Sequence, residues 1–374
     1  MTRTFACIAG GGTAGHLIPG LAVAEALIEG GRERDSICFI GGRRGPETTM
    51  VPGAGFELIG LPGRGIPRTV SVASIKAAWG IVRGVVSGVG IIRRLRPQVV
   101  VILGGYAAVP AAVGAIIWRI PMVVMEQNAR AGAANTLAGR FARASAVAFS
   151  TTGLPRAVMT GNPVRPEILQ IDRHRDRDDA RRELGLPLDR IVIAAFGGSL
   201  GSRRINQAVE GWVGRWSTRS DLAVHHVIGA RDWDAAGESP SSEVNGGATG
   251  IDYQRVRYEN RIPQMLAAAD LVISRAGGST VAELAIVGVG SILVPLPIAT
   301  RDHQTANAEP LVALGAAVAV PDAEFDSDRL IAEVSALLDA PGKLTVMASA
   351  ARSLGQRDAA NRVAALIEEH ARHD

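Results

Sequence analysis

The sequence predicts an α/β protein built from two Rossmann-like domains, each with a doubly wound parallel sheet. Short apolar runs rich in β-branched residues, such as 99–102, are typical of strands buried on both faces. Several runs lead through a glycine turn into helical periodicity, and this order restarts at residue 191. A chain of 374 residues is long enough for two cores. Proteins with two such halves usually bind their ligand between them, so we expect the domains to face each other across a cleft.

The composition excludes several protein classes. Hydrophobic residues make up 47% of the chain and charged residues 20%, which indicates a globular protein. Cys7 and Cys38 lie in apolar runs, so we expect buried, reduced thiols in a cytosolic protein, and no Cys/His cluster has metal-ligand spacing. We expect no signal peptide, because a strand follows directly on the first residues. The uncharged stretch 97–118 contains glycines and prolines, which favours a strand, a loop and a helix over a membrane span.

The first strand, 5–9, leads into a glycine turn at 10–15 and a helix over 21–28. The turn satisfies the G-x-G-x-x-G pattern of dinucleotide-binding proteins, which also place an acidic residue at the end of the second strand. Here the second strand, 37–40, ends in Gly-Gly-Arg-Arg, and the arginines could bind the 2′-phosphate of NADP. An NADP-dependent reductase therefore stays an alternative. His16 follows the turn, where its imidazole can reach a ligand and titrate near neutral pH.

A basic stretch without acidic residues extends from 58 to 125. Its apolar residues recur at near-helical spacing, which predicts an amphipathic helix on an anionic membrane surface. A packed helix with a solvated basic rim is the alternative, and four glycines between 80 and 90 weaken the helix prediction. The sequence pI of about 9.6 also admits nucleic acid, but no nucleic-acid-binding motif is present, so we favour the membrane. The basic residues are Arg64, Arg68, Lys76, Arg83, Arg93, Arg94, Arg96 and Arg119.

Two later strands of the first half end in candidate binding segments. Strand 99–102 precedes the turn Gly104-Gly105-Tyr106, and strand 122–125 ends in Glu126-Gln127-Asn128. Open α/β sheets bind their ligands at the carboxyl ends of strands. The charged segment 172–184 predicts a linker and a short exposed helix, whose D-x-D pattern we interpret as solvated charge.

The second half starts with a strand over 191–196, the glycine turn 197–202 and a helix from Ile205. The adjacent His225 and His226 should point to opposite faces of their strand. The remaining expected strands are 147–149, 224–228, 256–259, 291–294 and 316–320, and the remaining expected helices are 307–314, 330–338 and 349–370.

The stretch 271–283 carries the strongest local evidence for a ligand. An apolar strand, 271–273, runs into two glycines and a helix that we expect to start near Val281. Backbone N–H groups at a helix N-terminus bind phosphate well. Glu283, expected in the first helical turn, could accept hydrogen bonds from both hydroxyls of a ribose. The segment lacks the lysine of the P-loop motif, so it is not a P-loop. The segment predicts a nucleotide site, with an ordinary strand-to-helix turn as the alternative.

Taken in chain order, these motifs resemble those of the MurG family of N-acetylglucosaminyltransferases. The resemblance covers nearly the whole chain, and the set of motifs is highly specific although no single one is decisive. Two positions depart from the family pattern: Ala14 replaces a frequent glycine, and His303 precedes Gln304 where some members have a second glutamine. The matching segments are 12–20, 104–106, 126–128, 161–165, 197–201, 275–283 and 302–307.

The resemblance implies a GT-B glycosyltransferase that transfers GlcNAc from UDP-GlcNAc to lipid I, with inversion, and makes lipid II for peptidoglycan synthesis. It implies that Glu283 holds the ribose, that the backbone of Tyr258 and Glu259 reads uracil, and that Gln304 binds the sugar. The implied donor-binding residues are Thr13, Ala14, Gly15, Asn128, Arg165, Ser199, Tyr258, Glu259, Arg275, Gly278, Ser279, Thr280, Glu283 and Gln304, and the acceptor-binding residues are Gly104, Gly105 and Tyr106.

Inversion needs a base that takes the proton of the acceptor hydroxyl, and His16 is the first candidate and Glu126 the second. Helix N-termini can stabilise the departing UDP, so we expect neither a metal nor a cofactor. The expected domains are 1–165 on the acceptor and membrane side, 166–345 on the donor side, and a terminal helix, 346–374, that packs back on the first.

The implied partners are UDP-GlcNAc, lipid I, the anionic cytoplasmic membrane surface, and other cell-wall or division proteins, but no nucleic acid. The expected location is the cytoplasmic face of the cell membrane. Another UDP-sugar transferase with a lipid acceptor is an alternative, as are the reductase and a non-enzymatic membrane scaffold.

Overall fold

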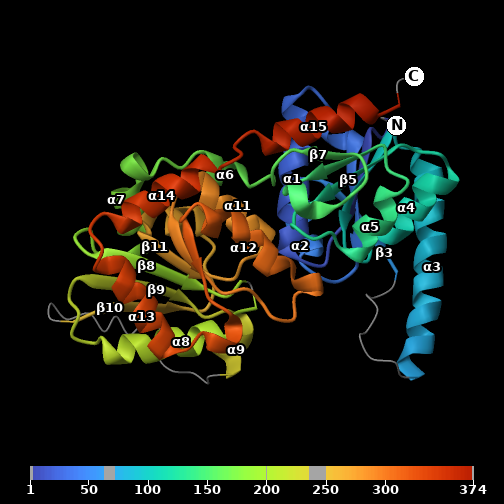
Figure 1. The fold of residues 1–374 in the computed structure, drawn as a ribbon. Coiled ribbons are helices and arrows are strands. Elements are labelled where there is room, and N and C mark those ends of the chain that lie inside the picture. The colour runs from blue at the N-terminus through green and yellow to red at the C-terminus, as the bar shows by residue number, and fades with distance from the viewer. Residues whose placement is uncertain (1–2, 63–71, 199, 236–249, 373–374) are drawn as a thin grey trace. The chain divides into compact units, whose positions relative to one another are not determined.

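The computed structural model describes residues 3–62, 72–198, 200–235 and 250–372, with only the backbone described over 72–82 and at residues 234, 235 and 300. The chain forms two compact units, and the predicted α/β class is confirmed (Figure 1). Unit 1 comprises residues 1–165 and 356–374, and unit 2 comprises 166–355. The segment 346–355 thus belongs to unit 2, whereas the sequence placed it with the terminal helix.

Unit 1 contains a seven-stranded sheet in the order β3-β2-β1-β4-β5-β6-β7, and all its pairings are parallel. The strand predicted at 147–149 lies earlier, at 144–147, and the edge strands β3 and β7 were not predicted because their residues are largely exposed or half-buried. The strands are β1 (Ala6–Gly10), β2 (Ile37–Gly42), β3 (Glu57–Leu61), β4 (Val99–Gly104), β5 (Met122–Glu126), β6 (Ala144–Val147) and β7 (Ala157–Met159).

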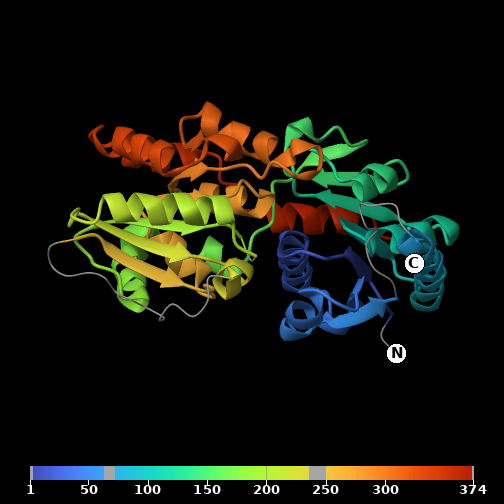
Figure 2. The same ribbon diagram turned by 90° about the horizontal axis from the view of Figure 1, so that it is seen from below.

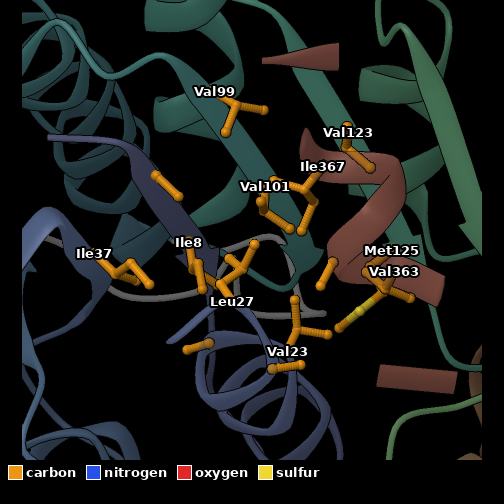
Figure 3. Close-up of a cluster of buried hydrophobic side chains, with 14 of the residues drawn as sticks. Ile8, Val23, Leu27, Ile37, Val99, Val101, Val123, Met125, Val363 and Ile367 are labelled. Carbon is orange, nitrogen blue, oxygen red and sulfur yellow. The ribbon is translucent and has the colours of Figure 1, made fainter. Parts of the chain in front are cut away.

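Helices cover both faces of this sheet (Figure 2). Alternate side chains of each strand enter opposite cores: Ile8 packs with α1, α2 and α15, whereas Cys7 packs with α3, α4 and α5. Figure 3 shows Val363 and Ile367 of α15 beside Val101 and Met125 of the sheet. The helices are α1 (Ala14–Glu29), α2 (Glu47–Gly53), α3 (Val72–Leu95), α4 (Ala108–Ile117), α5 (Ala133–Gly139) and α15 (Ala359–His370), with 3-10 turns η1 (Arg34–Ser36) and η2 (Ser150–Thr152).

Helix α3 forms despite its glycines, and one glycine from each helix, Gly88 of α3 and Gly114 of α4, lets α3 and α4 approach closely. A Cβ at Gly88 would lie 2.6 Å from Cβ of Pro110, and one at Gly114 would lie 3.0 Å from Ile92. A Cβ at Gly84 would collide with the hydroxyl of Tyr106. The predicted helix is confirmed, and Gly84 and Gly88 are packing residues rather than helix breakers.

Unit 2 contains a six-stranded parallel sheet in the order β10-β9-β8-β11-β12-β13, with the fully buried Trp212 in the core on one face. The strand predicted at 256–259 is wrong: β10 lies at 252–256 and only half-buried residues form it. The strands are β8 (Ile191–Phe196), β9 (Leu222–Val227), β10 (Asp252–Val256), β11 (Leu271–Ser274), β12 (Gly290–Leu293) and β13 (Ala317–Ala319).

The single helix predicted over 349–370 is also wrong, because the chain breaks it into α14 and α15 around Gly355. A Cβ there would lie 3.1 Å from the backbone of Ala285 and Ile286, so the chain passes directly against α11. The helices of unit 2 are α6 (Pro166–Leu169), α7 (Arg173–Leu184), α8 (Arg203–Arg215), α9 (Ala230–Ala235), α10 (Ile262–Ala268), α11 (Gly278–Val287), α12 (His303–Ala313), α13 (Ser327–Leu338) and α14 (Lys343–Ser353), with η3 (Thr300–Asp302) and η4 (Asp322–Glu324).

Helix α7 was expected to be exposed, but one of its arginines is fully buried. The guanidinium of Arg181 donates to Asp270 at 2.6 Å and to the carbonyl of Ala268 at 3.1 Å. The D-x-D aspartates on this helix pair instead with neighbouring arginines, Asp176 with Arg175 and Asp178 with Arg177. No helix among the described residues is both long and apolar enough to cross a membrane.

Candidate active site

The glycine turns that follow β1 and β4 of unit 1 touch backbone to backbone. A Cβ at Gly105 would lie 2.5 Å from the carbonyl oxygen of Gly11, and a Cβ at Gly10 would lie 2.6 Å from Cβ of Leu103. Gly105 also has a φ of +79°, which side chains other than glycine rarely adopt. These contacts explain why both turns are made of glycine.

His16 lies beside this pair of turns. Helix α1 begins at Ala14 rather than at the predicted residue 21, so His16 belongs to its first turn. Its Nδ1 is 3.0 Å from Oγ1 of Thr13, and its Nε2 would be 3.2 Å from a Cβ at Gly104. When Nδ1–H donates to the hydroxyl of Thr13, Nε2 carries the lone pair that a general base needs.

Glu126, the second candidate base, is 2% exposed and fully engaged with its own loop. Its Oε1 accepts from the backbone and side-chain N–H groups of Asn128, both at 3.1 Å. Its Oε2 accepts from the backbone of Gly132 at 3.0 Å and from the amide of Asn135 at 2.8 Å. Four donors therefore hold the carboxylate as the organiser of the loop that leads to α5, and the arrangement favours a structural role.

Glu47 is a buried carboxylate that the sequence reasoning missed. Its Oε2 accepts from the backbone N–H of Gly12 at 3.2 Å, and its Oε1 accepts from Gly42 at 3.0 Å. The N–H of Gly12 therefore faces an acid of the chain itself, which argues against a dinucleotide phosphate in this turn. One signal was available: Glu47 is the single acidic residue between 36 and 56.

The other candidates of unit 1 lie at the same carboxyl edge or at the end of the unit. The hydroxyl of Tyr106 donates to the carbonyl of Pro62 at 2.9 Å, and burial raises its pKa. This bond anchors the second turn to the chain after β3. Ala14 and Gly15 are the first two residues of α1, and the half-buried Arg165 is the last residue before unit 2.

Arg275 ties together the strand ends of unit 2. Its Nη2 donates to the hydroxyl of Ser202, the N-cap of α8, at 2.7 Å, and its Nη1 donates to the carbonyl of Val294 at 3.0 Å. An ion pair of 2.6 Å joins Nη1 to Asp322. The turns after β8, β11 and β12 are thus held by one guanidinium. Ser199 lies outside the described residues.

Helix α11 begins at Gly278, three residues before the predicted start, because the glycine turn passes directly into it. Ser279 and Thr280 therefore lie inside the first turn of the helix. The prediction that Glu283 lies in that turn is wrong, because Glu283 lies in the second turn, where it is 6% exposed. The N-cap is Gly277, so no side chain caps this described helix. The N-terminus of a helix is the kind of end that favours an anion, through its backbone N–H groups and its dipole.

The segment after β10 is held by a buried acid. Glu259 accepts from Nε2 of His225 at 3.1 Å and from the backbone N–H of Arg261 at 2.8 Å. Burial alone would raise the pKa of Glu259, but the bonds from His225 and Arg261 outweigh it and lower the pKa to about 2. These contacts fix the backbone around Tyr258, whose side chain is 55% exposed.

Gln304 stands at the start of α12, where its Oε1 accepts from the backbone N–H of Leu296 at 2.9 Å. The two residues Arg301 and Asp302 precede this helix with φ of +55° and +52°, a left-handed conformation that costs free energy in residues other than glycine. The loop after β12 is therefore pinned to α12 by Gln304 in a strained form.

The basic surface predicted for the membrane lies on α3 and α4 where side chains are described. Arg83 and Arg94 are exposed, and the guanidinium of Arg93 lies 5.2 Å from the ring centre of Trp118. Val86 is 66% exposed and Ile117 54% exposed. The predicted contributions of Arg64 and Arg68, and of the side chain of Lys76, lie outside the described residues.

Comparisons with known proteins agree on one family. The glycosyltransferase family 28 N-terminal domain matches residues 6–147, and the family 28 C-terminal domain matches residues 192–363. A UDP-N-acetylglucosamine–N-acetylmuramyl-(pentapeptide) pyrophosphoryl-undecaprenol N-acetylglucosamine transferase of Desulforudis audaxviator is 38% identical over 97% of both chains. The enzyme of the same name from Clavibacter michiganensis is 40% identical over 97% of this chain and 95% of its own. The crystal structure of Acinetobacter baumannii MurG is 26% identical, with a TM-score of 0.72 over 98% of this chain and 100% of its own.

Proposed function

The chain belongs to glycosyltransferase family 28, among the MurG enzymes, and from this premise we propose which of its residues bind the substrates and move the proton. It transfers N-acetylglucosamine from UDP-GlcNAc to the muramyl pentapeptide of lipid I, which gives lipid II and UDP for peptidoglycan synthesis. The observation that carries this conclusion is the 34–40% identity to these transferases over nearly the full chain.

We assign the donor to the carboxyl edge of unit 2. The N-terminus of α11, with Gly278, Ser279 and Thr280, would receive the diphosphate, because the backbone N–H groups and the positive dipole end of a helix favour an anion and the N-cap glycine has no side chain of its own to block it. Glu283 would accept the ribose hydroxyls. The assignment is supported by Arg275, which holds the turns around this helix in place.

The remaining donor roles rest on the family resemblance and on the rigidity of the segments. The backbone of Tyr258 and Glu259 would read uracil, since the bonds to Glu259 hold that backbone in place. Gln304 would bind the sugar hydroxyls, and Ser199 the phosphates. Thr13, Ala14, Gly15, Asn128 and Arg165 would contribute from unit 1.

We propose His16 as the general base. Its Nε2 would take the proton of the acceptor C4 hydroxyl as that oxygen bonds to the anomeric carbon and the bond from this carbon to UDP breaks, which inverts the centre. The bond from Nδ1 to Thr13 supports the required tautomer, whereas Glu126 would have to give up a hydrogen bond to act as a base. Gly104, Gly105 and Tyr106 would receive the acceptor beside His16.

We further propose that unit 1 attaches to the anionic cytoplasmic face of the membrane through α3 and α4. Exposed Arg83 and Arg94 supply charge, and Val86 and Ile117 supply apolar contact. Partners among other cell-wall or division proteins follow from the resemblance alone.

Two alanine variants test the assignment by affecting different steps. Glu283→Ala should weaken UDP binding by roughly 2–3 kcal/mol, because it removes a charged acceptor from the ribose. His16→Ala should lower turnover by roughly 10²–10⁴ at saturating substrates and leave UDP affinity unchanged. Glu309→Ala, an exposed carboxylate on α12, is the control for unit 2. Normal UDP binding by Glu283→Ala would remove Glu283 from the donor site, and near-normal turnover of His16→Ala would rule out a general base there.

A further inference from the structure

The carboxylate of Glu47 is enclosed by glycines, in the way that a glycine turn usually encloses a bound anion. The residue is 2% exposed and starts α2, and its carboxylate bridges the turn after β1 to the end of β2 through Gly12 and Gly42. A Cβ at Gly11 would lie 3.1 Å from the carboxylate carbon, and a Cβ at Gly45 would lie 2.6 Å from Oε2. Glycine at these positions leaves room for the carboxylate and for little else.

This arrangement changes the use of the first turn. In a strand, glycine turn and helix of this kind, the backbone N–H groups of the turn usually face a phosphate of the ligand. Here the anion comes from the chain itself, so the Gly12 N–H is already satisfied before any substrate binds. A phosphate at the same position would meet a buried negative charge, so Gly12 belongs to a scaffold and does not bind a phosphate of the ligand.

The scaffold leads directly to the candidate base. Gly12 precedes Thr13, whose hydroxyl lies 3.0 Å from Nδ1 of His16, and the neighbouring Gly11 packs against the turn at Gly105. Holding Gly12 therefore sets the place of Thr13 and His16 relative to the second turn. We propose that Glu47 is a positioning residue for the transferase reaction: it takes the place of a phosphate in the first glycine turn and so holds Thr13 and His16 in the geometry that the proton transfer needs. This inference rests on the proposed role of His16.

Glu47→Gln is the direct test, because glutamine keeps the size but has one carbonyl oxygen for the two backbone donors. Turnover should fall by roughly 10–100-fold, since small displacements of a catalytic group are costly, while the affinity for UDP, which is assigned to unit 2, should stay unchanged. Glu25→Gln is a matched control in the same unit: it leaves one acceptor oxygen for the two 2.9 Å bonds that Arg34 donates and should leave turnover unchanged.

A double-mutant cycle separates positioning from a general loss of structure. If Glu47 acts through His16, Glu47→Gln should cost little further turnover in the His16→Ala background. Equal losses in both backgrounds would overturn the proposal while leaving the base assignment intact, whereas near-normal turnover of His16→Ala would mean that the base assignment itself has failed. Glu47→Asp keeps the charge but moves it back by one methylene. Its loss of turnover should likewise become small in the His16→Ala background, and this variant replaces Glu47→Gln if the glutamine variant does not fold.

Discussion

Mild acid should destabilise unit 2 through a single buried histidine, His226. Its ring is fully buried in β9, with Nδ1 2.8 Å from the hydroxyl of Tyr253 and Nε2 3.0 Å from Oδ1 of Asn206. The amide nitrogen of Asn206 donates to the carbonyl of Ile228 at 3.0 Å, so its oxygen faces the ring and Nε2–H donates to it. A neutral imidazole satisfies both contacts, and burial lowers the pKa of His226 to about 3.

The magnitude follows from proton linkage. Because the pKa in the folded protein is depressed, the unfolded chain binds the proton more tightly, and the stability present above the unfolded pKa of about 6.5 is lost as pH falls toward about 3. Between pH of about 7.5 and about 5 the loss is about 2 kcal/mol, since the folded ring is still neutral at the lower pH. Glu259, with a folded pKa of about 2, begins to lose its contribution only below the unfolded carboxyl pKa of about 4.3, outside this range.

Urea unfolding of wild type and His226→Gln at both pH values measures this loss. The buried Trp212, which packs against Trp216 at 5.7 Å between ring centres, gives a fluorescence signal for unit 2. The free energy of unfolding should fall by about 2 kcal/mol more in wild type than in the variant. His174→Gln, at an exposed position on α7, should keep the wild-type pH dependence. The same pH dependence in wild type and His226→Gln would refute the reasoning.

Two further predictions concern unit 1. Gly105→Ala should destabilise the protein by about 1–3 kcal/mol in thermal unfolding, because its Cβ would lie 2.5 Å from the Gly11 carbonyl and φ at this position is +79°. The control Gly90→Ala places its methyl group in open space on α3 and should not destabilise the protein. Equal stability of the two variants would contradict this packing. Sedimentation with anionic liposomes should fall with rising salt and with Arg83→Glu combined with Arg94→Glu, since the surface potential of about −30 mV attracts both arginines. Salt-independent binding would indicate a purely apolar contact.

Local chemistry determined much of the fold and the general place of the site. Runs such as 99–102 and 191–196 became buried parallel strands, because β-branched side chains suit a strand covered on both faces. The glycine turns after β1, β4 and β8 appear where they were expected, since each contains positive φ angles that favour glycine. Helix starts were predicted too late at α1 and α11, because each helix begins directly at its turn, before apolar periodicity can reveal it.

Only the tertiary structure decided what the buried carboxylates do. Glu47, Glu126 and Glu259 each stand near a strand end, where an acid can bind a ligand or its own chain equally well. Packing resolves this for Glu47 and Glu259, because it brings donors from other segments to their oxygens: the backbone N–H of Gly12 to Glu47 and the ring of His225 to Glu259. These donors are separated from the acid by up to 35 residues in the sequence. A buried carboxylate is stable only where such donors form hydrogen bonds to it. The formation of these hydrogen bonds depends on how whole strands and helices are aligned, and no local sequence pattern contains that information.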